Sequence, residues 1–484
     1  MPARQICFDR GRLYINGNSR LFCLDSEEGR VLWKGRQYQY QPDPLLQTYA
    51  NLARNFNPSG KRLPSTNPEI QLFGDRLHPL VTVHDDSVYA IEGQLLDWGV
   101  KPNDGTINNT SVYLAGRHRS RKNWMAAYDA ATGKLKWHRP AAEATQLESG
   151  IPIGFLASPL PFGDNLLVPV SNKGELWVYS LRQDTGETVW KVFLRDEPVD
   201  GVSPWSAIGT AIEGGDLYLT TGMGYVFALD AATGKVHWAV QYTRKSSYPS
   251  ANLRGFNPSA ITSASNNGWI DDIVIPSGNQ LVVLPSDYDR IVTLDRRNGK
   301  LLWDASQVPS ENEPRANYCV GVSGEDLYVG SGEVIRKYNI PSGKLKWDQP
   351  IKNSLGQAAL TSEGVFVPTE NSIVKLDNRT GKIIARAEVY SPTGEPVGNL
   401  VSDGRHLYGV GLQRIYSLAS LTDRLQLLAK KIDNGDGEAQ LTRMRIHIRQ
   451  ENREAAISDL ESAIPKLRAR QGFWRSWEAL NTGL

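Results

Sequence analysis

The residues able to perform acid–base or metal chemistry are few and scattered among the 484 residues of this chain. Acidic pairs occur at Asp271–Asp272 and, in the segment SDYDR, at Asp287 and Asp289. Neighbouring carboxylates can share a proton or bind a cation, but polar turns contain such pairs routinely. We interpret both pairs as solvated turns, with acidic site loops as the alternative. The segment DNGDG at 433–437 lacks the ligand spacing of a calcium loop and is interpreted as a linker.

The seven histidines and three cysteines form no recognisable motif. No HxH or HExxH grouping is present, which disfavours a zinc hydrolase, and no GxSxG or P-loop supports an esterase or NTPase. Cys7, Cys23 and Cys319 form neither a CxxC nor an adjacent pair. We therefore predict no catalytic residue and no metal site, and the sequence assigns no cofactor-binding residue.

One basic cluster is a candidate for binding a partner. Arg117, Arg119 and Arg121 lie together with His118 and Lys122, and they could contact an anionic surface. A solvated insertion loop is the alternative interpretation of the same cluster. Aromatic residues of the neighbouring non-repetitive segments could form an interaction lip or stack on carbohydrate; they are Tyr38, Tyr40, Tyr49, Phe56 and Trp98. We name Arg117, Arg119, Arg121 and Trp98 as candidate partner-binding residues.

Composition and charge exclude several classes of function. The 54 basic and 52 acidic residues leave a formal net charge of +2, so no nucleic-acid or membrane-surface binder is expected. No run approaches the roughly 20 apolar residues of a membrane span. The first residues, MPARQICFDRGRLYI, lack the basic start and apolar run of a secretory signal. The protein is therefore expected either in the cytosol or as part of a longer precursor.

A repeated phrase organises the remainder of the chain. It reads DSEEGRVLW at 25–33, DAATGKLKW at 129–137, DAATGKVHW at 230–238 and DRRNGKLLW at 295–303. Looser copies are RQDTGETVW at 182–190, NIPSGKLKW at 339–347, DNRTGKIIA at 377–385 and a degenerate SLTDRLQL ending at 427. Self-similarity at this spacing is the signature of a repeat architecture.

Each copy follows two short segments of alternating apolar residues, a pattern typical of a β-hairpin. The Asp-x-x-Thr-Gly element predicts a tight turn, and Lys-Leu-x-Trp predicts a short outer strand. With one further strand upstream, each unit becomes a four-stranded antiparallel blade of about 40 residues. The sequence thus predicts an all-β, eight-bladed β-propeller over 1–430, with blades at 5–34, 80–138, 155–191, 205–239, 258–304, 316–348, 356–386 and 397–428.

Three segments interrupt this regular pattern and are predicted to be insertions, at about 35–79, 93–123 and 240–257. The run SVYLAG at 111–116 could alternatively be a strand of a partial extra blade. The repeated tryptophans are predicted to fill the seams between blades, with each indole N–H bonded to backbone, rather than to form a cofactor platform. These structural tryptophans are Trp33, Trp137, Trp190, Trp238, Trp303 and Trp347.

Residues 431–484 are predicted to form a small helical extension. Apolar residues at Ala456, Leu460, Ala463, Ile464 and Leu467 follow one face of a helix. The segment REAAISDLESAI resembles the second helix of a tetratricopeptide repeat, whereas the preceding helix matches that repeat poorly. One such hairpin cannot bury its own apolar face, so it is expected to pack on the propeller or to begin a helical array.

The phrase D-A-x-T-G-K-x-x-W, repeated after Leu-Tyr or Val-Phe strands, resembles the pyrroloquinoline-quinone (PQQ) type propeller repeat over about residues 5–428. That family includes quinoprotein alcohol dehydrogenases and the outer-membrane assembly lipoprotein of Gram-negative bacteria, and the resemblance implies an eight-bladed fold. In the dehydrogenases, PQQ lies beside calcium on the propeller axis, often clamped by a disulfide between adjacent cysteines. Here Cys7 and Cys23 fall two strand spacings apart, roughly 9–10 Å, which is too far to bridge.

The leading hypothesis is a non-catalytic scaffold or protein-binding module, for which the resemblance favours the periplasm or bacterial cell envelope. Protein partners are expected at the insertions and the C-terminal helices, with no nucleic acid and no cofactor. The alternative is a quinoprotein oxidoreductase that uses PQQ and calcium to oxidise alcohols or sugars. Carbohydrate binding by the insertion aromatics, with Trp98 as the test residue, is a third hypothesis.

Overall fold

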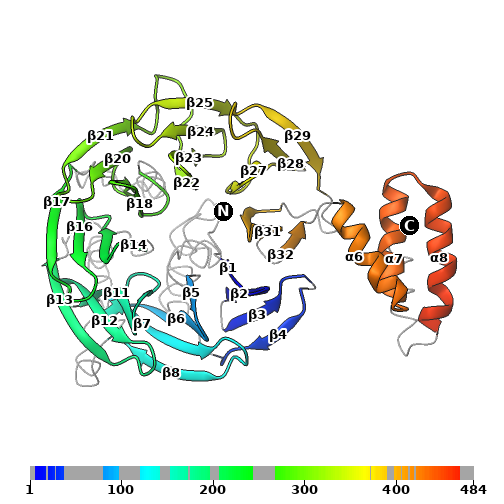
Figure 1. Cartoon of the computed structure of the whole chain (residues 1–484), viewed down its shortest axis with the longest axis horizontal. Helices are drawn as coiled ribbons and strands as arrows, with labels where there is room; N and C mark the ends of the chain where they lie inside the picture. Colours follow the sequence, from blue (N-terminus) through cyan, green and yellow to red (C-terminus); the bar gives the residue numbers. More distant parts are fainter. Residues whose placement is uncertain are drawn as a thin grey trace, which may run out of the picture. The chain divides into compact units, whose positions relative to one another are not determined.

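The structure is a computed structural model that describes residues 6–17, 20–27, 29–37, 80–97, 120–141, 153–172, 175–196, 207–243, 268–370, 372–389, 397–404, 406–411, 415–418 and 421–468. The chain divides into two compact units, Met1–Ser417 and Leu418–Leu484. The first unit is a ring of β-sheets and the second is helical (Figure 1).

The first unit is an eight-bladed β-propeller, which confirms the predicted fold class. Blade 1 contains β1 (Ile6–Asp9), β2 (Arg12–Asn16), β3 (Leu21–Asp25) and β4 (Val31–Lys34). Blade 2 contains β5 (Val81–His84), β6 (Ser87–Asp97), β7 (Ser120–Asp129) and β8 (Leu135–Pro140). Blade 3 contains β9 (Ile153–Phe155), β10 (Leu160–Phe162), β11 (Asn165–Asn172), β12 (Glu175–Arg182) and β13 (Thr188–Asp196). Blade 4 contains β14 (Gly209–Glu213), β15 (Asp216–Thr220), β16 (Tyr225–Asp230) and β17 (Val236–Gln241).

The second half of the ring repeats this order. Blade 5 contains β18 (Ile273–Ser277), β19 (Gln280–Leu284), β20 (Arg290–Asp295) and β21 (Leu301–Ser306). Blade 6 contains β22 (Tyr318–Ser323), β23 (Asp326–Gly330), β24 (Val334–Asn339) and β25 (Leu345–Pro350). Blade 7 contains β26 (Ala359–Thr361), β27 (Gly364–Pro368), β28 (Ser372–Leu376) and β29 (Ile383–Glu388). For blade 8 the described residues give three strands, β30 (Asn399–Ser402), β31 (Leu407–Val410) and β32 (Ile415–Leu418).

Within a blade, consecutive strands pair antiparallel in sequence order, except that β9 and β10 of blade 3 both pair with β11. The first strand of each blade lies nearest the centre of the ring (Figure 1). A parallel contact between β7 and β9, at Lys122 and Ile153, joins blades 2 and 3 into one nine-stranded sheet. The ring closes where blade 8 packs on blade 1, with Tyr408 and Val410 buried against Ile6, Leu13 and Ile15.

The repeated turn between the third and fourth strands has a simple chemical basis. In blade 2 the carboxylate of Asp129 accepts hydrogen bonds from the backbone N–H and the hydroxyl of Thr132, at 2.8 and 2.6 Å. These bonds from Thr132 hold the pKa of Asp129 below its usual value. Gly133 follows at φ +71°, a backbone conformation that side chains with a Cβ rarely adopt.

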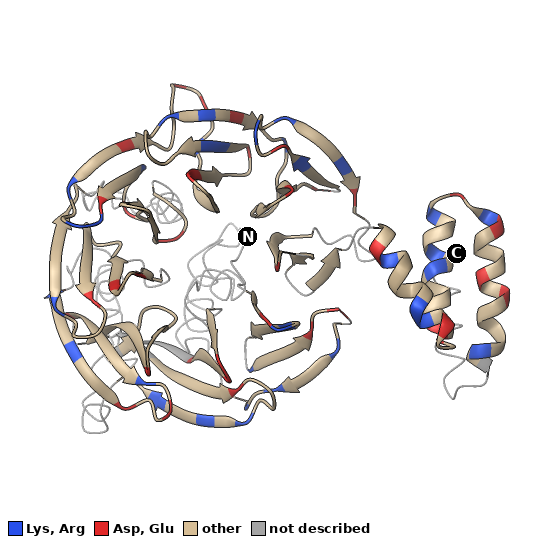
Figure 2. Cartoon of the chain, viewed as in Figure 1, with Lys and Arg blue, Asp and Glu red and all other residues tan. Residues whose placement is uncertain are grey.

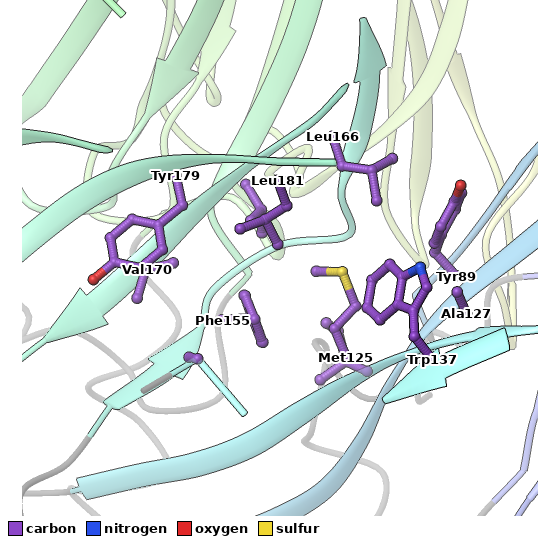
Figure 3. Close-up of a cluster of buried hydrophobic side chains, with 12 residues drawn as sticks. Tyr89, Met125, Ala127, Trp137, Phe155, Leu166, Val170, Tyr179 and Leu181 are labelled. Atoms are coloured by element: carbon purple, nitrogen blue, oxygen red, sulfur yellow. The ribbon is translucent and has the colours of Figure 1, made fainter. Parts of the chain in front are cut away.

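The hydrophobic core lies in the seams between blades rather than at one central point. In the seam between blades 2 and 3, Trp137 packs with Tyr89 and Met125 against Leu166 and Leu181 of the next blade (Figure 3). The ring centroids of Tyr89 and Trp137 lie 6.0 Å apart. Because each seam buries large side chains from two sheets, neighbouring blades stabilise one another.

Each of the six repeated tryptophans bridges to the following blade. Their indole N–H groups donate to backbone carbonyls there, at 2.8–3.3 Å, in the pairs Trp33–Ala130, Trp137–Gln183, Trp190–Ala232, Trp238–Arg296, Trp303–Ile340 and Trp347–Asn378. The indole also lies against the turn glycine of that blade. A Cβ placed on Gly133, for example, would come within 2.5 Å of the Trp33 ring.

The end of the propeller differs from the sequence-based interpretation. The segment SLTDRLQL, assigned to blade 8 within 397–428, begins helix α6 (Leu421–Asp433) instead of an outer strand. Leu421, Leu425 and Leu428 recur at helical spacing, and acidic Asp423 near the start with basic residues near the end suits the helix dipole. The boundary predicted after residue 430 is therefore too late, since the units divide after Ser417.

Two predicted insertions are also narrower than expected. Strands β6 and β7 extend into the segment 93–123, with Leu95 paired to Lys122 and Asp97 paired to Ser120. The segment predicted from 240 onward begins as the end of β17, followed by Tyr242. Segment 38–79, which makes up most of the first insertion, and the possible strand at 111–116 lie outside the described residues.

The helical unit contains α6, α7 (Gly437–Arg449) and α8 (Arg453–Arg468). Asp436, from the segment interpreted as a linker, caps α7 by accepting bonds from the N–H groups of Glu438 and Ala439. The predicted stripe of α8 is buried at Ala456, Ala463 and Leu467, with Met444 of α7 opposite. No described helix is both long and apolar enough to cross a membrane.

Candidate functional site

One end of the ring gathers the long connections of the propeller. In a four-stranded antiparallel blade, the turns between strands one and two and between three and four lie at one end. The connections between strands two and three, and those leading to the next blade, must then lie at the opposite end, which we call the connection end. The chain leaves this end after Lys34, Asp97, Pro140, Asp196 and Gln241. The parts of the three predicted insertions that lie outside the strands follow Lys34, Asp97 and Gln241 in the sequence.

Near the connection end, a buried acidic residue links blades 1 and 2. Glu92 of β6 has a side chain only 1% exposed, and it accepts bonds from the Nε and Nη2 of Arg36 at 3.0 and 2.7 Å. Tyr128 donates its hydroxyl to the other carboxylate oxygen. Burial first, and then the charge of Glu92, raises the pKa of Tyr128. Glu92 is thus a fully paired charge within a seam.

His138 of β8 borders this cluster without joining its hydrogen bonds. Its Nε2 is buried and 3.7 Å from Glu92, and its ring stacks on Trp124 with 6.3 Å between centroids. Burial, and then the charge of Arg36, lowers the pKa of His138 to about 4. The imidazole is therefore neutral at physiological pH, and Arg36 neutralises the carboxylate that would otherwise favour its protonation.

A second buried cluster lies between blades 4 and 5 at the same end. Asp272, just before β18, accepts bonds from the backbone N–H and hydroxyl of Ser286 at 2.8 and 2.9 Å. Asp287 accepts a 2.5 Å bond from Tyr242. Burial, followed by the charge of Asp287, raises the pKa of Asp272 well above its usual value, and burial with Asp287 likewise raises that of Tyr242. Asp272 is therefore a candidate for a carboxyl group that stays protonated.

This cluster corrects the interpretation of the acidic pairs. Asp272 and Asp287 are 5% and 8% exposed, so they are not solvated turn residues. Asp271 and Asp289 are half-buried. The sequence shows only that these acidic residues lie next to the ends of strands. It does not show how deeply they are buried, because the neighbouring blade determines their burial.

A third charged group at this end is Arg336 of β24, whose side chain is fully buried. It donates to Asp348 at 2.8 Å, to the carbonyl of Gln307 at 2.8 Å and to Glu313 at 3.5 Å. The two acidic partners offset its charge, as a buried guanidinium requires. This group ties the connection between blades 5 and 6 to the sheet of blade 6.

The candidate partner-binding residues are only partly placed. Arg121 lies in β7, where its backbone pairs with Leu96, rather than in an insertion loop. Arg117, Arg119 and Trp98 lie outside the described residues. The described residues therefore do not test whether these four residues form a site. Figure 2 shows acidic and basic residues around the whole ring.

A quinone with its calcium ion needs a group of oxygen ligands around the metal. Among these residues, no group of three or more His, Cys, Asp or Glu side chains is arranged to hold a metal ion. Cys7, Cys23 and Cys319 are free thiols, and Cys7 and Cys23 flank Tyr14 on successive strands. Asp272 and Asp287 already accept bonds from Ser286 and Tyr242. The described part of the chain therefore does not fit this cofactor pair.

Comparison with known proteins identifies a propeller family. The family model described as outer membrane protein assembly factor BamB matches residues 80–247, 174–353 and 251–461. A polyvinylalcohol dehydrogenase from a Pseudomonas species is 24% identical over 358 residues, which cover 62% of this chain and 54% of that protein. The chain thus spans about half the length of this curated relative.

One solved structure supports the same fold, and a second is similar at a slightly lower score. The quinohemoprotein alcohol dehydrogenase of Comamonas testosteroni superposes with a TM-score of 0.50 at 14% identity, covering 85% of this chain and 71% of the other. BamB of Moraxella catarrhalis superposes with a TM-score of 0.49 at 14% identity, covering 85% and 92%. At this level of identity the similarity concerns the fold alone.

Proposed function

Because the chain belongs to the family of the outer membrane protein assembly factor BamB, we propose that it is a propeller scaffold that binds a protein partner in the bacterial cell envelope. The family match over most of the ring is the observation that carries this proposal. A rigid ring with long connections at one end suits the binding of another protein, because loops on a rigid scaffold commonly carry binding residues. The connection end is the proposed binding face.

The paired polar and charged groups near the connection end are expected to make that end of the ring rigid. The pairs Arg36–Glu92, Arg336–Asp348 and Ser286–Asp272 each join two segments, and in each pair one side chain (Glu92, Arg336 or Asp272) is buried. Groups with satisfied partners rigidify the surface that carries the connections. A rigid surface loses less conformational entropy when a partner binds.

The proposal is tested by comparing the two ends of the same blades. A photo-crosslinking amino acid replaces Glu311 or Lys352 at the connection end, and Arg297 or Lys344 at the opposite end, in the full chain within its native cells. All four positions are exposed. We expect one defined protein to crosslink from the connection end and not from the opposite end. Equal crosslinking from both ends, or none from either, would refute the proposed binding face.

A PQQ- and calcium-dependent oxidoreductase is the second candidate, favoured by the identity with polyvinylalcohol dehydrogenase over 358 residues. Its test is incubation of the full chain with PQQ and Ca²⁺, followed by absorbance measurement and dye-linked oxidation of polyvinyl alcohol and small alcohols. The scaffold proposal predicts no stoichiometric quinone and no substrate-dependent dye reduction. Stoichiometric quinone with dye reduction would establish the oxidoreductase instead.

A further inference from the structure

Polar side chains replace apolar ones at one place in the seam between blades 5 and 6. Two positions of the repeat meet across a seam near the connection end: the fourth residue after the repeated tryptophan of one blade, and the third residue before the turn phrase of the next blade. In four other seams the two residues share one apolar cluster, as the pairs Ala141–Tyr179, Leu194–Phe227, Tyr242–Val292 and Ile351–Val374. In the seam between blades 5 and 6 these residues are Gln307 and Arg336.

The contacts of Arg336 show that the two positions also face each other in this seam. Its fully buried guanidinium donates to the carbonyl of Gln307 at 2.8 Å and to the carboxylate of Asp348 at 2.8 Å, with Glu313 at 3.5 Å. Paired charges therefore take the place of an apolar contact here. These bonds satisfy the guanidinium, but none of them involves the side-chain amide of Gln307.

The amide of Gln307 is buried without a hydrogen-bond partner among the described residues. Gln307 is 1% exposed, and neither its Oε1 nor its Nε2 bonds to another described group. Its backbone, in contrast, is held by Asp289, whose carbonyl accepts its N–H at 3.0 Å, and by Ala316, whose N–H donates to its carbonyl at 3.2 Å. Blades 5 and 6 both lie within 268–370, a range that the structure describes completely. Because buried polar groups almost always bond to protein or to ordered water, this amide requires a ligand.

We propose that the amide of Gln307 binds an ordered water molecule in the seam between blades 5 and 6. Water accepts a bond from Nε2 or donates one to Oε1, and a buried water typically makes about three hydrogen bonds to groups that lack other partners. The neighbouring charges exclude an ion in its place. Arg336 already has two carboxylate partners, Asp348 and Glu313, which repel an anion, and its own charge repels a cation. A small neutral ligand that both donates and accepts is therefore required.

The bound water fixes the start of the connection between blades 5 and 6. Gln307 is the first residue after β21, and the connection extends to Asn317, next to β22. Arg336 holds the carbonyl of Gln307 and the water holds its side chain, so the residue is held from both sides. This inference goes beyond the proposed function, because it concerns the interior of a seam and requires no partner protein. Its tests can therefore succeed or fail independently of crosslinking at the connection end.

Water oxygen-17 magnetic relaxation dispersion tests the site in the full chain. The dispersion amplitude reports the water molecules that stay bound long enough to tumble with the protein. We expect Gln307→Leu to lose the contribution of one such water. The matched control is Gln349→Leu, which removes a glutamine amide from a half-buried position of β25 and should leave the amplitude unchanged. An amplitude that is the same in Gln307→Leu and in the unaltered chain would overturn the proposal.

A high-resolution crystal structure of the unaltered full chain provides a test that depends on no variant. We expect a water molecule about 2.7–3.2 Å from Oε1 or Nε2 of Gln307, the usual length of such hydrogen bonds. The same water should bond at least one further polar group of the seam. An amide of Gln307 that bonds only to protein atoms, or that has no neighbour within this distance, would refute the water site.

Discussion

At the scale of single residues, the ring depends on one recurring contact between two very different side chains. A tryptophan from one blade fits beside the turn of the next only because that turn carries a glycine without a Cβ. The same glycine accepts the positive φ that the turn requires. Because both residues repeat at fixed spacing, their packing between blades could be predicted from the sequence. The hydrogen-bond partners of Asp272 and Glu92 belong to no repeat, so they could not be predicted.

Replacing Gly133 by Ala should destabilise the propeller more than replacing Gly29. Both substitutions impose the cost of a left-handed residue, about 1–2 kcal/mol. The Gly133 variant alone also drives a Cβ into Trp33, which lies 2.5 Å from the ideal position. We expect that overlap to add about 1–3 kcal/mol. Urea unfolding of the two variants measures the difference, and equal midpoints would mean that the glycine–tryptophan contact contributes nothing.

At the scale of elements, the sequence predicted strands wherever the turn phrase was intact and failed where it decayed. The last degenerate copy retains apolar residues but has neither the glycine nor the tryptophan, and it forms α6. The spacing of its leucines indicates a helix, but the repeat pattern led us to predict another strand here. The strand pairing of residues 93–97 and 120–122 was missed for a different reason, because a long hairpin shows no change in alternation where it leaves the blade.

The seam between blades 4 and 5 should become less pH-dependent in an Asp272→Asn variant. The folded pKa of Asp272 lies above its unfolded value, so the folded state holds this proton more tightly. Its stabilising effect is present below about pH 4 and is lost as the pH rises toward the folded pKa. Asparagine keeps an acceptor for the backbone N–H of Ser286 and cannot ionise.

The thermal midpoint of the Asn variant should therefore exceed that of the unaltered chain at pH 8, and the difference should shrink toward pH 4. Glu311→Gln, which removes an exposed carboxylate at the same end, serves as the control and should show no such trend. A variant that loses stability equally at every pH would indicate that Asp272 is ionised in the folded protein.

At the scale of the whole molecule, the chain consists of a ring and a separate helical unit. The sequence correctly predicted a β-sheet unit followed by a helical unit, because the spacing of apolar residues changes from every second residue to that of a helix. It placed the boundary too late, since α6 follows directly on the last strand. The number of blades followed from counting copies of the repeated phrase, whereas the described residues give blade 8 three strands, and the copy predicted to form its fourth strand lies in α6.

Removal of the buried ion pair between Arg443 and Asp459 should destabilise the helical unit without destabilising the ring. Asp459 of α8 is 5% exposed and accepts bonds from Arg443 at 2.5–3.2 Å; although burial opposes ionisation, these bonds hold its pKa below the usual value. Asp459→Ala leaves a largely buried guanidinium unpaired, which costs about 3 kcal/mol. Hydrogen exchange should accelerate throughout α7 and α8 while the strands of blade 6 keep their protection.

The control is Glu461→Ala, which removes an exposed carboxylate from the same helix and should change hydrogen exchange in neither the helices nor the strands. If the blade strands lose protection together with the helices, the two units unfold as one cooperative body, and the division after Ser417 has no energetic meaning.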